Sequence, residues 1–256
     1  MFIDTEGRGP PLVLVHGWAM HGGIFAPLRE ALAERFTLHV VDLPGHGRSP
    51  ERDGSMKLRE CATRIADAVP GAIWIGWSLG GLVALEAALE RPLYVRAIAL
   101  IAASPRFVAA PDWPHGVEHA VFDAFGRDLA HDWRGTVDRF LALECVGSDC
   151  ARSDLRALRA QVFEHGEPAL HGLDDGLRIL ANTDLRPHLA ELECPSLWIA
   201  GARDRLVPWQ AMEAAAARAP GGSFVRIDGG GHAPFIGHPD RVLHAIDDWL
   251  ARALPA

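Results

Sequence analysis

A serine placed between two glycines is the first feature of this chain that could do chemistry. The apolar run AIWIGW (72–77) ends in the pattern Gly76-x-Ser78-x-Gly80, and helical spacing begins directly after it. In a sharp turn from a strand into a helix, flanking glycines remove Cβ atoms that would clash, and the serine hydroxyl stands clear of the sheet. The N–H groups at the start of the helix can also stabilise a developing negative charge. This context predicts a nucleophilic serine, and an ordinary tight turn is the alternative.

A serine hydroxyl needs a base to activate it, and the base needs an acid to orient it. For a serine in such a turn, the expected chain order is serine, acid, histidine. Asp204 follows the apolar run SLWIAG (196–201), and His232 follows the run SFVRID (223–228) and three glycines. Both lie where strands end, which is the edge at which α/β sheets carry their chemistry. Asp228 is the rival acid and is nearer to His232, but it belongs to the strand itself, so we favour Asp204.

The chain contains 13 histidines, so His232 has competitors. His238 precedes Pro239 at the start of the last helical pattern, where a capping or surface role is expected, and His244 falls within that helix. His232 instead lies on a glycine-rich loop after a strand, and it is therefore the predicted base.

Two backbone N–H groups could bind the negative charge that develops on the carbonyl oxygen of a substrate. In this type of site, one N–H belongs to the residue after the nucleophile and the other to an earlier loop that follows a strand. The first is Leu79. The second is Trp18, because the run LVLVH (12–16) is followed by Gly17 and Trp18. We expect Gly17 to let this loop pass close to Ser78.

Strands and helices alternate along most of the chain. Short apolar runs predict strands at 12–16, 36–41, 72–77, 95–102, 196–201 and 223–228. Several runs are apolar throughout, as expected when helices cover both faces of a sheet. The segments between them show helical spacing, which predicts an α/β fold with a mostly parallel sheet flanked by helices.

The alternation stops between residues 107 and 184. This segment has no convincing strand and contains amphipathic helical patterns at 116–130, 133–146, 151–163 and 172–183. Long insertions into an α/β core commonly cover its active site. We therefore predict a core of residues 1–106 and 185–256, with a helical lid inserted at 107–184.

Composition and charge argue against several classes of protein. The net charge of −8 argues against nucleic-acid binding, which requires a basic face. We expect no signal peptide, and no stretch approaches the roughly 18 apolar residues of a membrane span. The four cysteines form no C-x-x-C pair, which predicts free buried thiols in a reducing cytoplasm and makes metal or redox ligation unexpected.

The chain resembles the α/β-hydrolase superfamily over essentially its full length. The matching pieces are the serine turn, His16 with Gly17, DLPGHGRS (42–49), ARDRLVP (202–208) and GGGHAPFIGHP (229–239). Asp42 and His46 in the stretch DLPGHGRS receive no catalytic role. Three pieces are similar to the esterases that act on the methyl ester of pimeloyl-acyl carrier protein in biotin synthesis: IGWSLGGLVA (75–84), DWP (112–114) and TVDRFLALE (136–144).

The resemblance implies a reaction and the residues that bind its substrate. The reaction is hydrolysis of a methyl ester at the tip of a pimeloyl chain, which acyl carrier protein holds through phosphopantetheine, and it requires no metal or organic cofactor. Trp18, Phe140, Leu143 and Glu144 are the residues expected to bind the acyl chain. Phe140 and Leu143 share one helix face at a spacing of three, and plain packing of that helix on the core is the alternative.

A carrier protein as partner requires a basic surface, because acyl carrier proteins are acidic and this chain is acidic too. Arg152, Arg156 and Arg159 fall on one face of a predicted helix, and Arg139 on the preceding helix can join them. The planar guanidinium also suits the phosphate of phosphopantetheine. We expect this face to dock the carrier; a solvated face with acids such as Asp154 nearby is the alternative.

Other functions share the same three residues. A general short-chain carboxylesterase, a thioesterase or a carbon–carbon bond hydrolase of this fold would differ only in the lid. A non-catalytic ligand-binding protein of this fold is a further alternative, which a short-chain ester assay with Ser78→Ala would separate from an enzyme. Haloalkane dehalogenases and epoxide hydrolases need a carboxylate at position 78, where this chain has serine.

Overall fold

The computed structural model describes residues 1–49 and 55–254. Its sheet has seven strands in the order β1-β3-β2-β4-β5-β6-β7, and only the β1–β3 pair is antiparallel. The strands are β1 (Phe2–Gly7), β2 (Pro11–Val15), β3 (Thr37–Asp42), β4 (Ala72–Trp77), β5 (Val95–Ile101), β6 (Ser196–Gly201) and β7 (Gly222–Ile227). The predicted α/β class with a mostly parallel sheet is confirmed. Strand β1 was not predicted, because FIDTEG mixes polar and apolar residues at a half-exposed edge.

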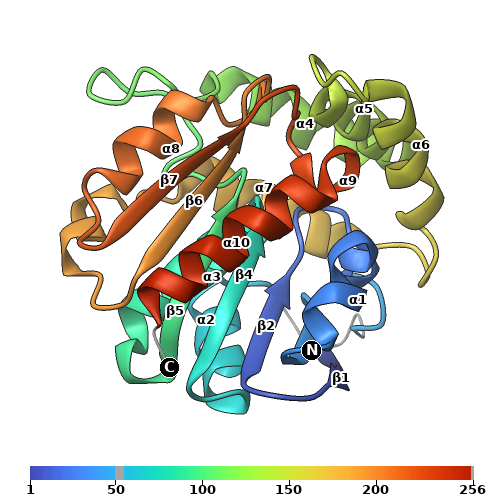
Figure 1. The fold of residues 1–256 in the computed structure, drawn as a ribbon. Coiled ribbons are helices and arrows are strands. Elements are labelled where there is room, and N and C mark those ends of the chain that lie inside the picture. Colours follow the sequence, from blue (N-terminus) through green and yellow to red (C-terminus); the bar gives the residue numbers. More distant parts are fainter. Residues whose placement is uncertain (50–54, 255–256) are drawn as a thin grey trace.

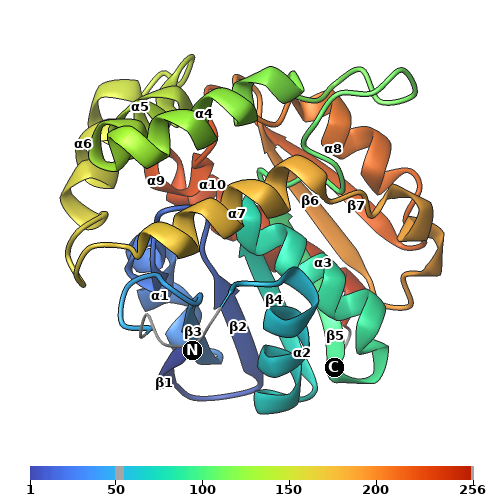
Figure 2. The same cartoon turned by 180° about the vertical axis from the view of Figure 1, so that it is seen from behind.

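Helices cover both faces of the sheet, which explains why its central strands are apolar throughout. One face carries α1 (Ala26–Ala33) and α10 (Pro239–Ala253), and the other carries α2 (Leu58–Ala68) and α3 (Leu79–Glu90) (Figures 1 and 2). Helix α8 (Trp209–Ala216) packs on β6 and β7, and the short α9 (Pro234–Gly237) precedes α10. The described residues of this part also include the 3₁₀ segments η1 (Gly22–Phe25), η3 (Pro92–Tyr94) and η4 (Arg186–Glu191).

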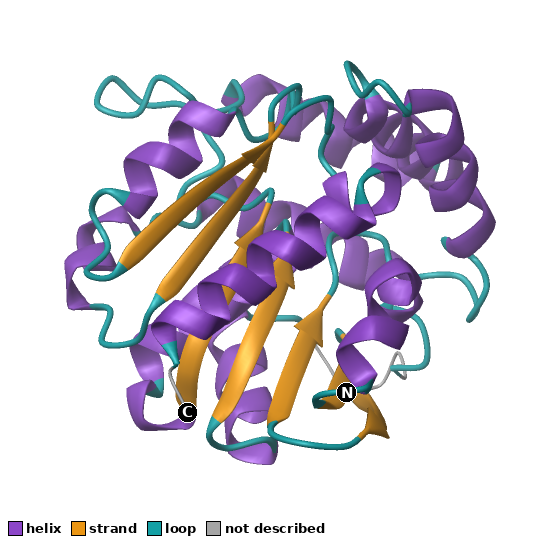
Figure 3. Cartoon of the chain, viewed as in Figure 1, coloured by secondary structure: helices purple, strands orange, loops and turns teal. Residues whose placement is uncertain are grey.

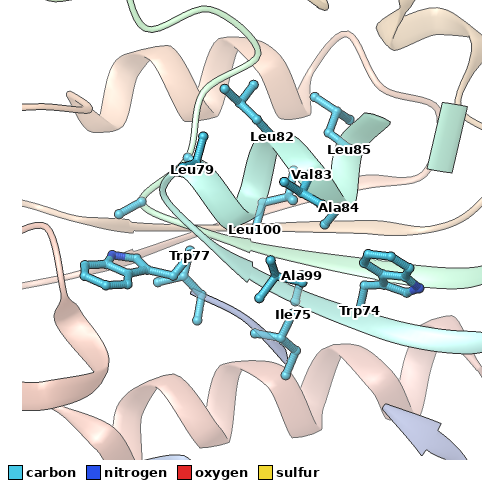
Figure 4. Close-up of a cluster of buried hydrophobic side chains, with 14 of the residues drawn as sticks. Trp74, Ile75, Trp77, Leu79, Leu82, Val83, Ala84, Leu85, Ala99 and Leu100 are labelled. Atoms are coloured by element: carbon cyan, nitrogen blue, oxygen red, sulfur yellow. The ribbon is translucent and has the colours of Figure 1, made fainter. Parts of the chain in front are cut away.

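The turn from β4 into α3 is deeply buried. Every residue of β4 is buried, and Figure 4 shows Ile75 of this strand pointing to the opposite face of the sheet from α3 and its apolar side chains. Helix α3 is buried from Leu79 to Ala88, so little of it faces solvent. Burial of this kind stabilises by about 1.5–3 kcal/mol per large apolar side chain, which fixes the turn at Ser78 firmly in the core.

A helical segment (residues 107–184) lies between β5 and β6. It contains α4 (His119–His131), α5 (Trp133–Cys145), α6 (Ala151–Gln161) and α7 (Leu170–Asn182), and isolated bridges rather than strands precede α4. Helices α4 to α6 lie beyond the arrowhead ends of the strands (Figures 1 and 3). The two ends of the segment meet, because Arg106 Nη1 lies 2.8 Å from Asp184 Oδ2 and the N–H of Leu185 donates to the carbonyl of Pro105. Among the described residues, no helix is long and apolar enough to cross a membrane.

Candidate active site

The serine turn has the strained geometry that its sequence predicts. Ser78 joins β4 to α3 with φ 54° and ψ −116°, a positive φ that is uncommon for a residue with a side chain. A Cβ on Gly76 would lie 2.3 Å from the carbonyl oxygen of Gly80, and a Cβ on Gly80 would lie 2.0 Å from that of Val15. The N–H of Ser78 donates to the carbonyl of Ile101 (3.0 Å), which holds the turn against β5. Glycine is therefore required on both sides of the serine.

Ser78, His232 and Asp204 form a continuous chain of hydrogen bonds. His232 Nε2 lies 2.8 Å from Ser78 Oγ, and His232 Nδ1 lies 2.8 Å from Asp204 Oδ2. Asp204 Oδ1 accepts from the N–H groups of Leu206 (2.8 Å) and Val207 (3.0 Å), so both of its oxygens are engaged. This arrangement can take a proton from a serine hydroxyl and hold the imidazolium that results.

The rival acid lies elsewhere. The side chain of Asp228 is 72 % exposed and faces Arg226 and Arg241, with closest N–O separations of 3.5 and 4.0 Å. Burial disfavours the charged form of His232, but the neighbouring carboxylate of Asp204 outweighs it and the net pKa of His232 is raised. The structure thus brings Asp204, and not Asp228, to the histidine.

The loop after β2 lies against the serine turn. A Cβ on Gly17 would lie 2.9 Å from the indole ring of Trp77, so this loop passes close to the residue before Ser78. Leu79 is the first residue of α3, and its N–H therefore has no acceptor within the helix. The role of the Trp18 and Leu79 N–H groups as an oxyanion hole stays a prediction.

Buried histidines support this loop without taking part in the chemistry. Burial, followed by the neighbouring His46, lowers the pKa of His16 to about 3, so His16 is neutral. Its Nε2 accepts from the N–H of Leu43 (2.9 Å), and its Nδ1 therefore donates to the carbonyl of Gly17 (2.7 Å). Asp42 accepts from the N–H of Gly22 (2.7 Å) and is likewise structural.

The helical segment covers Trp18 with an aromatic cluster. The rings of Trp18 and Phe140 meet edge to face with centroids 4.6 Å apart, and Phe125 contacts Phe140 from α4 at 5.5 Å. Trp18 Nε1 donates to the carbonyl of Leu173 in α7 (2.8 Å), a contact that no sequence signal indicated. Phe140 is buried and Leu143 is half-buried, and the contact of Phe140 with Trp18 places α5 beside the predicted oxyanion loop.

Glu144 is a buried acid next to the catalytic candidates. Its carbonyl accepts from the N–H of His232 (3.0 Å), whereas neither of its carboxylate oxygens has a hydrogen-bond partner. Burial raises the pKa of Glu144 to about 8, with His232 and Asp204 close enough to add smaller effects. The carboxyl group is therefore mostly protonated at neutral pH.

Sequence reasoning gave no role to Trp77, although it stands directly before the nucleophile. Trp77 Nε1 donates to the carbonyl of His232 (2.8 Å) and so anchors the loop that carries the base. The resemblance singled out tryptophan at this place, but only the folded chain gives it a partner 155 residues away.

The four arginines of the predicted docking face differ in their surroundings. Arg159 forms a two-point contact with Asp138 (2.6 and 2.7 Å), and Arg139 lies 3.2 Å from Asp128. Arg152 and Arg156 are exposed on α6, and neither forms an ion pair with any residue that the structure describes. Two of the four charges are thus already compensated within the helical segment.

Comparisons with known proteins agree with this geometry. Residues 10–239 match the alpha/beta hydrolase fold family. The chain is 58 % identical, over the full length of both chains, to the pimeloyl-[acyl-carrier protein] methyl ester esterase of Xanthomonas campestris pv. campestris. It is 56 % identical to the enzyme of the same name from Stenotrophomonas maltophilia, over 100 % of this chain and 98 % of the relative.

Solved structures support the fold alone. An esterase from Exiguobacterium antarcticum superposes with a TM-score of 0.85 at 20 % identity, over 97 % of this chain and 94 % of the other. A thermophilic esterase from Thermogutta terrifontis superposes with a TM-score of 0.84 at 24 % identity, over 98 % and 93 %. The chain therefore belongs to the alpha/beta hydrolase fold family, and within it to the family of its Xanthomonas and Stenotrophomonas esterase relatives.

Proposed function

We propose that this carboxylic ester hydrolase converts the methyl ester of pimeloyl-acyl carrier protein to pimeloyl-acyl carrier protein and methanol, in biotin synthesis. The observation that carries the chemistry is the pair of 2.8 Å contacts that join Ser78, His232 and Asp204. The names of relatives at 58 and 56 % identity supply the substrate. We expect the reaction to take place in the cytoplasm, without a nucleic-acid partner.

The first half of the reaction transfers the acyl group to the enzyme. Ser78 Oγ attacks the carbonyl carbon of the ester while His232 Nε2 takes its proton, and Asp204 stabilises the imidazolium. The N–H groups of Trp18 and Leu79 hold the oxyanion that forms. When the tetrahedral intermediate collapses, the methoxy oxygen takes the proton from His232 and leaves as methanol.

The second half releases the acid. His232, neutral again, accepts a proton from a water molecule as that water attacks the acyl carbon. The bond to Ser78 Oγ then breaks, and His232 returns the proton to Oγ. Side chains, backbone N–H groups and water supply each step, so we expect the reaction to need no metal or organic cofactor.

We assign the choice of acyl chain to the helical segment. Phe140 on α5 packs against Trp18, and in our proposal Phe140 and Leu143 line a channel for the pimeloyl chain. Glu144 lies at the inner end of this face, near His232. Because its carboxyl group is mostly protonated at pH 7, it can donate a hydrogen bond to an ester oxygen without placing a charge in the channel.

We assign docking of the carrier protein to α6. Arg152 and Arg156 offer two uncompensated charges to an acidic partner and to the phosphate of phosphopantetheine. Arg139 and Arg159 pair with acids of the segment, and in our proposal they hold the two helices that form the face.

The direct test is a comparison of two substrates. We expect a higher kcat/KM for the methyl ester of pimeloyl-acyl carrier protein than for free dimethyl pimelate, since only the first can use the docking face. Ser78→Ala should abolish turnover of both while the circular dichroism spectrum stays unchanged. Equal kcat/KM values for the two substrates would favour a general carboxylesterase, and activity of Ser78→Ala within tenfold of wild type would refute the nucleophile.

A further inference from the structure

A cluster of potential metal ligands lies outside the catalytic site, where the helical segment meets the loop of His232. Asp149 and Cys150 directly precede α6, and His238 lies between α9 and α10. The N–H of Asp149 donates to the carbonyl of Gly229 (3.0 Å), at the start of the loop that carries His232. The cluster therefore joins the helical segment to the core.

The three side chains offer one nitrogen, one oxygen and one sulfur atom. His238 Nε2 lies 3.0 Å from Asp149 Oδ1, and these two atoms and Cys150 Sγ all lie within 4.8 Å of one another. Zn²⁺ binds such mixed sets at about 2.0–2.3 Å, so ligand atoms on one ion lie roughly 3–4 Å apart. Because the side chain of Asp149 is 47 % exposed, a small rotation can bring the three atoms onto one ion.

Asp154 adds an independent observation. It is only 5 % exposed, its Oδ2 accepts from Ser148 Oγ (2.7 Å), and its Oδ1 has no hydrogen-bond partner. A Cβ on Gly237 would lie 3.1 Å from Asp154 Oδ1 and 3.3 Å from Cys150 Sγ, so both atoms border the same space. A buried carboxylate oxygen without a partner is costly, and a cation in that space would satisfy it.

We propose that His238, Asp149 and Cys150 bind one borderline divalent transition-metal ion such as Zn²⁺, whose charge the buried carboxylate of Asp154 helps to balance. The ion ties α6 to the end of α9 and so fixes the helical segment on the core. Since a thiol gives up its proton when it binds such an ion, the affinity rises with pH. The sequence did not indicate this site, because two of its ligands, Asp149 and His238, are 89 positions apart.

Calorimetric titration of the chelator-treated protein with Zn²⁺ tests the site. We expect one ion per chain and a higher thermal midpoint, since a ligand of the folded state stabilises it. Cys150→Ser and His238→Gln should each weaken Zn²⁺ binding by at least about tenfold, the lower end of the loss seen even for residues that only support a ligand. The matched control is His244→Gln, which removes an exposed histidine paired with Asp248 (3.3 Å) and should leave binding unchanged.

Cobalt gives a readout that identifies the thiolate. Co²⁺ bound to the wild-type protein should show a sulfur-to-cobalt charge-transfer band, which Cys150→Ser abolishes and Cys194→Ala retains. If His238→Gln does not fold, the exposed Asp149→Asn takes its place in the titration. Absence of Zn²⁺ binding to wild type, or binding that is equal in the ligand variants, overturns the proposal.

Discussion

The three catalytic candidates and the helical segment that covers them are supported in different ways. Ser78, Asp204 and His232 follow β4, β6 and β7, which run parallel in one sheet, and hydrogen bonds from backbone N–H groups hold their loops at 2.8–3.0 Å. The helical segment begins and ends at one ion pair, Arg106 with Asp184, and packs over the site with its side chains. It also contacts the loop of His232 through two backbone hydrogen bonds, from His232 to Glu144 and from Asp149 to Gly229. The sheet thus positions Ser78 and Asp204, while the helical segment supports the loop of His232 through the carbonyl of Glu144 and can vary elsewhere.

The same difference separates the residues that perform the reaction from the residues that control the access of a substrate. Ser78 is only 1 % exposed, so we expect the helical segment to shift when a substrate reaches it. Substitutions in the loops of the sheet should therefore lower the rate for every ester. Substitutions in the helical segment should act on stability or on particular substrates.

The largest expected effect on activity comes from replacing the orienting acid, Asp204, which belongs to a loop of the sheet. Asp204→Asn should lower kcat on the order of 10⁴-fold, because an amide holds the histidine in the wrong tautomer. Asp228→Asn is the matched control and should stay near wild type, since its side chain is 72 % exposed. Kinetics on a small methyl ester measure both variants, and a reversed ranking would make Asp228 the orienting acid.

Glu144→Gln should reveal a pH-dependent cost in stability. The carboxyl pKa rises from 4.5 to about 8 on folding, so the folded state keeps a proton that the unfolded state loses between these pH values. The free energy of unfolding of wild type, relative to that of the glutamine variant, should therefore fall as the pH rises through this window. The decrease reaches about 3 kcal/mol by pH 7. Thermal melting of both proteins from pH 4.5 to 8 measures it. A melting difference that does not change with pH would mean that Glu144 is ionised and paired.

Phe140→Leu should act on substrate choice. In our proposal this side chain lines the acyl channel, so kcat/KM should fall for the monomethyl ester of pimelic acid by roughly tenfold, the scale of a changed apolar contact, but not for methyl acetate. Phe125→Leu, which alters the same aromatic cluster from α4, is the control and should spare this preference. Equal losses on both esters together with a lower melting temperature would show that Phe140 only packs the segment on the core.

The smallest effect is expected at the docking face. Replacing Arg152 and Arg156 with Glu should lower kcat/KM for the carrier-bound ester by a few fold, and more at low salt, where exposed charges are least screened. Replacing Arg139 and Arg159 instead should mainly lower the melting temperature, because both already pair with acids. A small methyl ester should be hydrolysed normally by the first variant, and equal loss on both substrates would end the docking hypothesis.

The sequence predicts the sheet and the catalytic candidates because both depend on local patterns. Apolar runs located every parallel strand to within about two residues, as they must be buried on both faces. The serine turn was predictable because only glycine fits at Gly76 and Gly80, where a Cβ would lie 2.3 and 2.0 Å from backbone oxygens. The local pattern did not predict β1, because this strand mixes polar and apolar residues and pairs with β3 at an exposed edge of the sheet.

Long-range contacts could not be predicted in the same way. The bond from Trp77 to the carbonyl of His232 and the bond from Trp18 to that of Leu173 each join positions 155 residues apart. The residues next to Trp18 and Trp77 in the sequence do not indicate which backbone carbonyl each indole N–H will reach. The net charge of the arginine face could not be predicted either. Helix spacing placed Arg159 on this face, but it did not show that Asp138 of the preceding helix would pair with it.

Covalent labelling of the serine tests the central claim, that the loops after β4, β6 and β7 bring together an activated nucleophile. A small fluorophosphonate reacts only with a serine hydroxyl that a neighbouring base activates, and peptide mapping identifies the labelled residue. We predict a single label on Ser78 in the wild-type protein, and its loss in His232→Gln. A label on another serine, or equal labelling of Ser78 in His232→Gln, would contradict this account.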